Sequence, residues 1–450
     1  MPLFIGGNAQ GIREMTPLNY GSKESKQGES HDTKVNQLHD QCGNNKNNRS
    51  ALSRTETCSV LVDIKRQQRR RHCKQKQVLI QSKTAFEFHS QTMIGAQKAK
   101  KRQAPFLRRF SQVKSPPLYA ALDLGTNNCR LLIASPSEPG YFRVVDAFSR
   151  IVRLGEGLIN NGLLKTQAMD RAIEALKICR LKLKQRHIKR YRLIATEACR
   201  SAENGRYFIQ RVLDETGLEL EIVDRQTEAR FAVTGCSTLV EPNTEAIVLF
   251  DIGGGSSEIV LLDVSQKRSF RLAGQITAWT SLPVGVVTLA ERFGGNNICL
   301  DDFEKMKNYV RGLLNNFSDR HKLGKLAQGS KFHLLGTSGT VTTLAGMYLN
   351  LERYDRRKVD GIWMDDADIT LMTKRLLSWD IEKRVINPFI GREKADLVLA
   401  GCAILDVIRE VWPSQRLRVA DRGLREGILI ELMLRDGVWC RRRKSRNFKR

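Results

Sequence analysis

Between residues 119 and 239, apolar runs alternate with segments of helical spacing. The stretch YAALDLGTNNCRLLIAS reads as an apolar run, a polar turn and a second apolar run, which predicts two strands. The following YFRVVDAFSRIVRLG predicts a third strand, and the apolar positions of residues 164–187 cluster toward one side, which predicts an amphipathic helix. Strands and helices alternate after it, so the predicted order is βββαβαβα.

The same pattern restarts near residue 245. There EAIVLFDIGGGSSEIVLLDV again reads as strand, small-residue turn and strand, and RSFRLAGQITAWTSLPVG supplies a third extended run. Asp123 and Asp251 lie 128 positions apart, and DLGTNN aligns with DIGGGS. Such internal similarity predicts a duplicated α/β domain with a cleft between the two halves.

Composition and charge narrow the class of protein. A chain of 450 residues with 41% hydrophobic content is long enough for two or three domains with large cores. Its 75 Lys and Arg against 48 Asp and Glu give a net charge of +27, which favours anionic partners such as phosphates, nucleic acid or acidic lipid. Residues 1–117 carry 22 basic and 8 acidic side chains, so the folded remainder is only moderately basic.

The two ends of the chain differ from its middle. The first 115 residues are rich in Gln, Asn, Ser, Lys and Arg without a persistent period, so they are predicted to be disordered. Their basic run at 65–76 and a second one at 441–450 fit either a tether for RNA or polyphosphate or a solvated tail, and we favour the tail. The predicted division is a basic segment at 1–115, domains at 116–242 and 243–436, and a basic tail at 437–450.

Two further features concern the compartment. No apolar run approaches the roughly 18 to 20 residues of a membrane-spanning helix, and the N-terminus lacks the order of a secretory signal. The 10 cysteines form no CxxC pair, so we interpret them as reduced thiols. We expect a cytoplasmic protein without a membrane partner. None of the motifs requires nucleic acid as a partner. The sequence is consistent with a homodimer and with a monomer.

The glycine-rich turns are candidate phosphate-binding loops. Without a Cβ, converging backbone N–H groups form a nest for an anion. The candidate phosphate ligands are Gly125, Thr126, Asn127, Gly253, Gly254, Gly255 and Ser256. Glycine also makes ordinary hairpin turns, so a single such turn would be weak evidence, whereas two at equivalent places in a repeat favour phosphate handling. A third candidate loop is LLGTSGTVTTL, with Gly336 and Ser338 at a helix start.

An aspartate precedes each of the two turns. A carboxylate would repel phosphate directly, so Asp123 and Asp251 are predicted to hold a divalent cation or its waters. Glu258, just beyond the second turn, is a further candidate ligand.

Seven motifs, taken in order, resemble the exopolyphosphatase and guanosine pentaphosphate phosphatase (Ppx/GppA) family of the actin-like ATPase superfamily. They are DLGTNNCRLLI, IATEACRSAENG, EIVDRQTEARF, VLFDIGGGSSEIVL, LPVGVVTLAERF, LLGTSGTVTTLAG and VADRGLREGIL. The resemblance runs from about Tyr119 to Leu434 and is to the short form, without extra helical domains. It implies two actin-like (ribonuclease H-like) domains and Mg²⁺-dependent hydrolysis. Thr126 and Asn128 depart mildly from the family's usual DIGSNS.

The resemblance also implies roles for two side chains. Glu228 in RQTEARF matches the family's catalytic glutamate, which would orient a water and accept its proton. Arg200 in TEACRSA matches a family arginine that would stabilise negative charge in the transition state. From the residues alone, each would be an ordinary surface side chain. Asp421 and Arg422 in DRGLREG fit either a site or an ion pair that fixes the last helices.

The sequence therefore predicts hydrolysis of the terminal phosphoanhydride bond of inorganic polyphosphate, of guanosine pentaphosphate, or of both. The motifs do not separate these two substrates. Two other classes of function are consistent with a phosphate cradle: an actin-like kinase that transfers phosphate to an organic acceptor, and a non-catalytic sensor of polyphosphate or an alarmone. The combination of Glu228 with Arg200 argues against a pure sensor, because binding alone needs neither.

Overall fold

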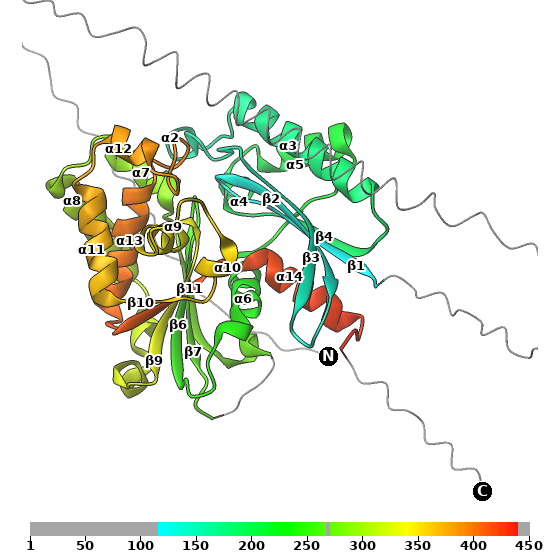
Figure 1. The fold of residues 1–450 in the computed structure, drawn as a ribbon. Helices are drawn as coiled ribbons and strands as arrows, with labels where there is room; N and C mark the ends of the chain where they lie inside the picture. The colour runs from blue at the N-terminus through cyan, green and yellow to red at the C-terminus, as the bar shows by residue number, and fades with distance from the viewer. Residues whose placement is uncertain (1–115, 267–270, 440–450) are drawn as a thin grey trace, which may run out of the picture. The chain divides into compact units, whose positions relative to one another are not determined.

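A computed structural model describes residues 116–266 and 271–439 (Figure 1). The predictions for residues 1–115 and for the tail beyond 439 lie outside this range. All described residues belong to one compact unit. Within the described ranges, no helix has both the length and the apolar character that crossing a bilayer would need.

The first sheet has five strands in the order β3-β2-β1-β4-β5. The strands are β1 (Leu118–Leu124), β2 (Asn128–Pro136), β3 (Phe142–Ile151), β4 (Ile188–Ala195) and β5 (Glu221–Ile222). The first three form an antiparallel meander, while β4 runs parallel to β1 and β5 parallel to β4. The helices among them are α2 (Leu158–Asn161), α3 (Thr166–Lys184), α4 (Glu197–Ser201), α5 (Gly205–Thr216) and α6 (Arg225–Cys236). The predicted βββαβαβα order is confirmed, with short α2 and α4 added.

The second sheet has six strands in the order β10-β11-β9-β6-β7-β8. They are β6 (Ala246–Ile252), β7 (Ser257–Asp263), β8 (Ile276–Leu282), β9 (Phe332–Thr337), β10 (Trp363–Asp365) and β11 (Arg416–Ala420). The accompanying helices are α7 (Val286–Phe293), α8 (Leu300–Asn315), α9 (Gly339–Tyr348), α10 (Arg356–Val359), α11 (Asp366–Leu377), α12 (Ile381–Ile386), α13 (Val398–Val411) and α14 (Leu424–Arg435), with short 3-10 turns η1 (Ser237–Leu239), η2 (Leu272–Gln275), η3 (Ser318–His321) and η4 (Gly324–Gln328).

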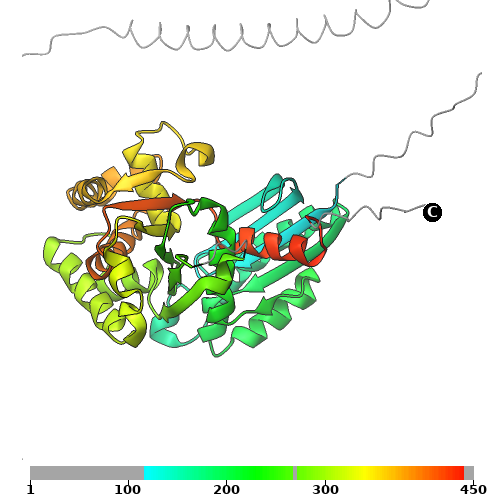
Figure 2. The ribbon, with the colours of Figure 1, turned by 90° about the horizontal axis from the view of Figure 1, so that it is seen from below.

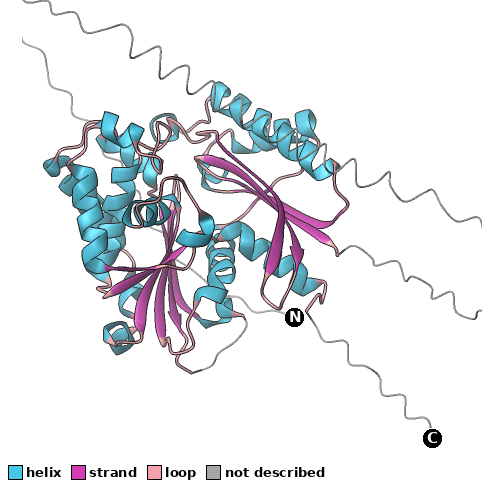
Figure 3. Ribbon diagram, in the orientation of Figure 1, coloured by secondary structure: helices cyan, strands magenta, loops and turns pink. Residues whose placement is uncertain are grey.

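Both sheets contain the same arrangement of four strands, as the sequence repeat predicts (Figure 3). In each, an antiparallel meander is followed by a strand parallel to the first strand of that meander: β4 beside β1, and β9 beside β6. The leading strands β1 and β6 are almost entirely buried because helices cover both faces of each sheet. Such strands read as continuous apolar runs rather than as alternating ones.

The last helix, α14, follows the second sheet in the chain but packs against the first (Figure 2). It contacts β1, β2 and β4 and lies along α6. Two glycines permit this contact: a methyl group on Gly427 would lie 2.0 Å from the Phe231 carbonyl oxygen, and one on Gly235 would lie 2.0 Å from that of Gly423. Through its contact with α6, α14 therefore links the first sheet to the end of the last strand of the second sheet, β11.

A buried histidine lies away from these junctions, on β9. The His333 ring is 4.9 Å from that of Trp363, in an edge-to-face arrangement. The guanidinium groups of Arg416 and Arg418 stand 4.1 and 4.6 Å from the Trp363 ring, and Glu241 accepts hydrogen bonds from Trp363 and Arg418. Burial, with a smaller contribution from the positive charge of Arg416, lowers the pKa of His333 to about 4, so the ring is neutral at pH 7.

Candidate active site

The two glycine-rich turns have the same construction. In the first, the Gly125 N–H donates to the Asn128 carbonyl over 2.9 Å, and in the second the Gly253 N–H donates to the Ser256 carbonyl over 2.9 Å. Each turn closes a hairpin between two buried strands and follows an aspartate near the end of the leading strand. Because the flanking strands are apolar and buried, the turns lie deep in the molecule. The glycines permit the backbone to turn tightly there.

These two turns lie against each other. A methyl group on Gly254 would lie 3.0 Å from the Cβ of Thr126 and 3.2 Å from the backbone nitrogen of Asn127. A methyl group on Gly255 would lie 2.7 Å from the Thr126 hydroxyl oxygen. The candidate phosphate ligands from opposite halves of the repeat are therefore brought together, in close approach rather than across an open gap.

The third candidate loop contributes differently. The Ser338 hydroxyl accepts the N–H groups of Thr340 and Val341 over 3.2 and 3.4 Å, so it caps helix α9. A methyl group on Gly336 would lie 2.6 Å from the Phe250 ring, which places this glycine against the core. Both residues thus have structural partners, and their predicted role in phosphate binding stays a prediction.

Three carboxylates gather beside the turns. Asp251 and Glu258 face each other across strands β6 and β7. Glu258 is 2% exposed, and its Oε1 accepts the hydroxyls of Ser256 at 2.7 Å and Ser281 at 2.9 Å. Burial raises the pKa of Asp251 to about 8, and the nearby carboxylates of Glu258 and Asp123 contribute to the rise. The three predicted metal ligands thus share one electrostatic environment.

The same region contains an orphaned oxygen. The Oδ1 atom of Asn127 is buried and has no hydrogen-bond partner. Across the described ranges, no group of three or more His, Cys, Asp or Glu side chains is arranged to hold a metal ion by itself. Buried oxygen atoms with raised carboxyl pKa values are nevertheless the donor chemistry that suits a hard cation whose remaining ligands are waters or substrate oxygens.

Glu228 and Arg200 are in direct contact, and their catalytic roles stay predictions. Glu228 lies in the first turn of α6, whose N-cap Asp224 accepts the Thr227 N–H over 2.7 Å. Arg200 donates from Nη2 to Glu228 Oε2 over 3.1 Å. Burial raises the pKa of Glu228, and Glu258 and Asp123 raise it further, while Arg200 opposes them. The sequence-predicted acid therefore lies within electrostatic reach of the predicted metal ligands.

Glu197, for which no role was predicted, holds Arg200 in place. Glu197 Oε2 accepts Arg200 Nη2 over 2.6 Å and Nε over 3.1 Å, and Oε1 accepts the Ser201 hydroxyl over 2.6 Å and Arg225 Nη2 over 2.9 Å. Burial alone would raise the pKa of Glu197, but the hydrogen bonds from Arg225, Ser201 and Arg200 outweigh it and lower the pKa. The spacing of Glu197, Arg200 and Ser201 on α4 is the one signal in the sequence for this network.

Basic side chains line the same region. Arg130 lies opposite Asp123 in the register of β1 and β2. Burial lowers its pKa and so does Arg425, while the carboxylates of Asp123 and Asp251 act in the opposite direction. Lys394 is also close, because Arg130 contributes to the lowering of its pKa after burial itself. Three cations near the paired turns favour an anionic ligand with several charges.

Asp421 and Arg422 do not pair with each other. Arg422 donates from Nε to Asp360 over 2.9 Å, whereas Asp421 pairs with Arg356 over 3.4 Å. Arg356 also donates to Glu426 over 2.8 Å. The ion-pair interpretation therefore holds with different partners, which tie α14 and the loop before it to α10.

The two sheets, each with a glycine-rich hairpin turn after its leading strand, place the protein in the actin-like class. Within that class the chain belongs to the Ppx/GppA phosphatase family, whose sequence model matches residues 133–436. A solved Ppx/GppA family member from Aquifex aeolicus is 26% identical with a TM-score of 0.57, covering 71% of this chain and 98% of its own. An exopolyphosphatase from Cytophaga hutchinsonii is 25% identical with a TM-score of 0.62 and the same coverage.

A curated relative is the bifunctional 3-dehydroquinate synthase/phosphatase of Fusobacterium nucleatum, 28% identical over 345 residues. The match covers 74% of this chain and 49% of the relative, so the chain spans about half the length of that protein. The resemblance to the family and the predicted actin-like α/β fold are confirmed.

Proposed function

We propose that the protein hydrolyses the terminal phosphoanhydride bond of inorganic polyphosphate or of guanosine pentaphosphate and releases orthophosphate. The observation that carries this proposal is the contact between Glu228 and Arg200 beside two glycine turns that touch each other. A glutamate with a raised pKa can accept a proton from an attacking water. The neighbouring turns offer N–H groups to the phosphate oxygens that surround the reacting phosphorus.

In this arrangement, most of the N–H groups of Arg200 are already bound to other residues and few remain for a phosphate. It makes four hydrogen bonds, two to Glu197, one to Glu228 and one to the Val223 carbonyl. A guanidinium has five N–H groups, so Arg200 holds Glu228 in place and keeps one N–H for a phosphate oxygen. Arg225, which is bound to Glu197 through Nε and Nη2, keeps its Nη1 group for the same purpose.

We propose Asp123, Asp251 and Glu258 as the residues that hold Mg²⁺, directly or through waters. Their raised pKa values, caused mainly by burial, fit a site whose charge a cation would balance. When bound, Mg²⁺ would neutralise charge on phosphate oxygens. Arg130, lying opposite Asp123, would bind further phosphates of the same substrate.

The proposal includes two substrates, a long polyphosphate chain and the nucleotide guanosine pentaphosphate. Arg130, Arg425 and Lys394 would attract either, because both carry several phosphates. The choice is measured by orthophosphate release from each substrate, with and without Mg²⁺, on the same preparation of the full chain.

The decisive variant is Glu228→Gln, which keeps the shape of the side chain and removes the base. Loss of a general base costs about 10²–10⁴-fold in rate, so orthophosphate release should fall at least a hundredfold. Glu382→Gln is the matched control, since Glu382 is exposed on α12 and the same charge is removed. Unchanged turnover in a folded Glu228→Gln protein would refute the assignment. Labelled phosphate recovered on an organic acceptor instead of water would indicate a kinase.

A further inference from the structure

Strand β4 has an open edge over most of its length. On one side it pairs with β1 from Leu118 to Leu124, but on the other it pairs with β5 only at Ile194 and Ala195. In the parallel register of β5, residues 217–220 would continue the pairing along β4. They leave the sheet instead, because Leu218 and Leu220 are buried in the core of the first domain. The edge of β4 before Ile194 is therefore unpaired within the described part of the chain.

The direction of the backbone groups follows from two hydrogen bonds. The Ala195 carbonyl accepts the Val223 N–H over 3.1 Å on the β5 side, and the Thr196 N–H donates to the Leu124 carbonyl over 3.1 Å on the β1 side. Because the backbone N–H and carbonyl groups alternate in direction along a strand, those of the odd-numbered residues from Tyr191 to Ala195 point toward the β5 side, which is the open edge before Ile194. The N–H and carbonyl of Tyr191 thus point outward, and no described residue hydrogen-bonds to them.

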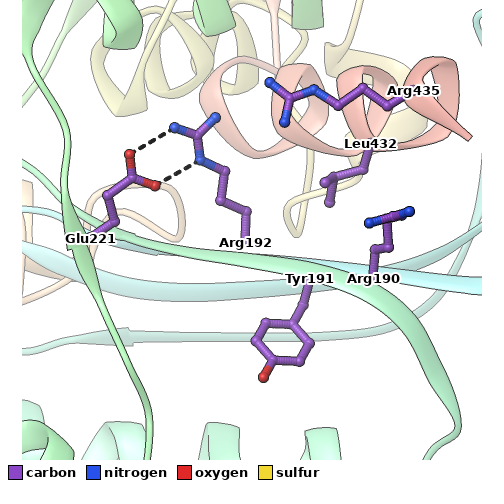
Figure 4. Close-up of a pocket in the computed structure, with 6 residues that line it drawn as sticks. All are labelled: Arg190, Tyr191, Arg192, Glu221, Leu432 and Arg435. Atoms are coloured by element: carbon purple, nitrogen blue, oxygen red, sulfur yellow. Dashed lines mark hydrogen bonds and ion pairs between the residues drawn. The ribbon is translucent and has the colours of Figure 1, made fainter.

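A pocket of about 530 Å³ lies at this edge (Figure 4). Its residues are Arg190, Tyr191, Arg192, Glu221, Leu432 and Arg435. Figure 4 shows the side chains of Arg190 and Arg192 on the side of α14, and that of Tyr191 on the opposite side of the strand. An added strand would meet positive charge on one face and an aromatic ring on the other.

The charge of the pocket favours acidic side chains on the face toward α14. Arg190 donates from Nε to Asp436 over 2.5 Å and Arg435 from Nη2 to Glu431 over 2.6 Å, so most of their N–H groups have no acceptor among the described residues. Arg192 makes a two-point pair with Glu221, at 2.9 and 3.0 Å. With Lys189 the edge has four basic side chains against three acidic ones.

We propose that the open edge of β4 binds an extended acidic segment of a partner protein as an added antiparallel strand. The segment would alternate Glu or Asp, facing the arginines, with apolar residues, facing Tyr191. Two copies of β4 paired with each other would place basic side chains opposite basic ones, which is unfavourable. The chain's own residues 440–450 contain seven basic and no acidic side chains, so charge disfavours them as well.

The test uses the full chain and a labelled peptide with alternating Glu and Val, seven residues long, followed by fluorescence anisotropy. Tyr191→Pro removes the outward N–H without touching the bonds to β1, and proline is tolerated at such edge positions. Tyr191→Thr keeps the N–H and is the matched control. We expect Tyr191→Pro to weaken binding about tenfold and Tyr191→Thr to change it less than threefold. Orthophosphate release should be unaltered in both, because Tyr191 lies outside the phosphate site.

Two further arms keep the proposal testable if Tyr191→Pro misfolds. A peptide N-methylated on its valines cannot donate to the edge and should bind about tenfold more weakly to the unmodified protein. Arg435→Gln should weaken binding of the Glu peptide and reduce its dependence on salt. The proposal is overturned if the N-methylated peptide binds equally well, if a peptide with Lys for Glu binds as tightly, or if segregating Glu from Val leaves affinity unchanged.

Discussion

The contact between α6 and α14 permits a quantitative prediction, since it depends on the absence of side chains at two glycines. In Gly427→Ala, the new methyl group would lie 2.0 Å from the Phe231 carbonyl oxygen and 2.7 Å from the carbonyl carbon. Ordinary contacts of a Cβ begin near 3.4 Å. Because both obstructing atoms belong to the backbone of α6, no rotamer change relieves the overlap. The helices must move apart by roughly 1.4 Å.

The cost follows from two opposing terms. Overpacking in a well-packed contact costs about 1–3 kcal/mol, and a rigid backbone obstacle favours the upper end. Alanine has a higher helix propensity than glycine, which raises the free energy of unfolding by about 1 kcal/mol. The free energy of unfolding should therefore fall by about 2 kcal/mol. The change should also slow orthophosphate release, since α6 carries Glu228 in its first turn.

The matched control is Gly312→Ala, in the exposed part of α8. Apart from the adjacent backbone of its own helix, no atom lies within 4 Å of the position where its methyl group would stand, so only the propensity term applies. We expect the free energy of unfolding to rise by about 0.5–1 kcal/mol. Urea titration followed by circular dichroism gives both values from the midpoint and slope. If Gly427→Ala proves as stable as the unmodified protein while Gly312→Ala behaves as expected, the close approach of α6 and α14 is wrong.

Three other changes test the site and the core. Glu197→Gln should reduce turnover about 10- to 100-fold, because Arg200 loses a charge-assisted hydrogen-bond partner, while the fold by circular dichroism is kept. Gly255→Ala should raise the KM for phosphate substrates by pressing on the facing turn, whereas Gly274→Ala, whose methyl group would meet nothing within 4 Å, should leave KM unchanged. His333 has a folded pKa of about 4 against 6.5 unfolded, so stability is full above pH 6.5 and falls by about 3 kcal/mol as the pH drops toward 4. In His333→Phe this slope should disappear from urea midpoints measured across that window, and an unchanged slope would contradict the burial of a neutral ring.

Local patterns were enough to predict the turns and their strands. The apolar runs that became β1 and β6 are continuous because both of their faces are covered, and each ends where glycine permits a tight turn. Asp123 and Asp251 could be chosen because each stands at the same distance before its turn. The repeat predicts a cleft between the two halves, whereas a methyl group on Gly254 would lie only 3.0 Å from the Cβ of Thr126, so the two turns stand in close approach.

The sequence contains no comparable pattern that predicts which side chains from separate elements come into contact. Arg225, in α6, reaches Glu197 in α4, and Lys394 lies close to Arg130 although more than 260 positions separate them. A basic side chain in a helix or loop is most often solvated, so sequence alone gives no reason to select these among 75 Lys and Arg residues. The return of α14 to the first sheet was likewise invisible, because its apolar positions fit either core.

The two halves of the repeat have diverged at one position that decides their electrostatics. Seven residues after the aspartate, on the strand that pairs with it, the first half has Arg130 and the second has Glu258. Asp123 therefore faces a cation, while Asp251 faces another carboxylate, which helps raise its pKa to about 8. A positive charge at one turn suits phosphate oxygens directly, and paired acids at the other suit a cation. The same hairpin, used twice, thus places opposite charges beside the paired turns, an asymmetry that fits the proposed binding of phosphate together with a metal ion.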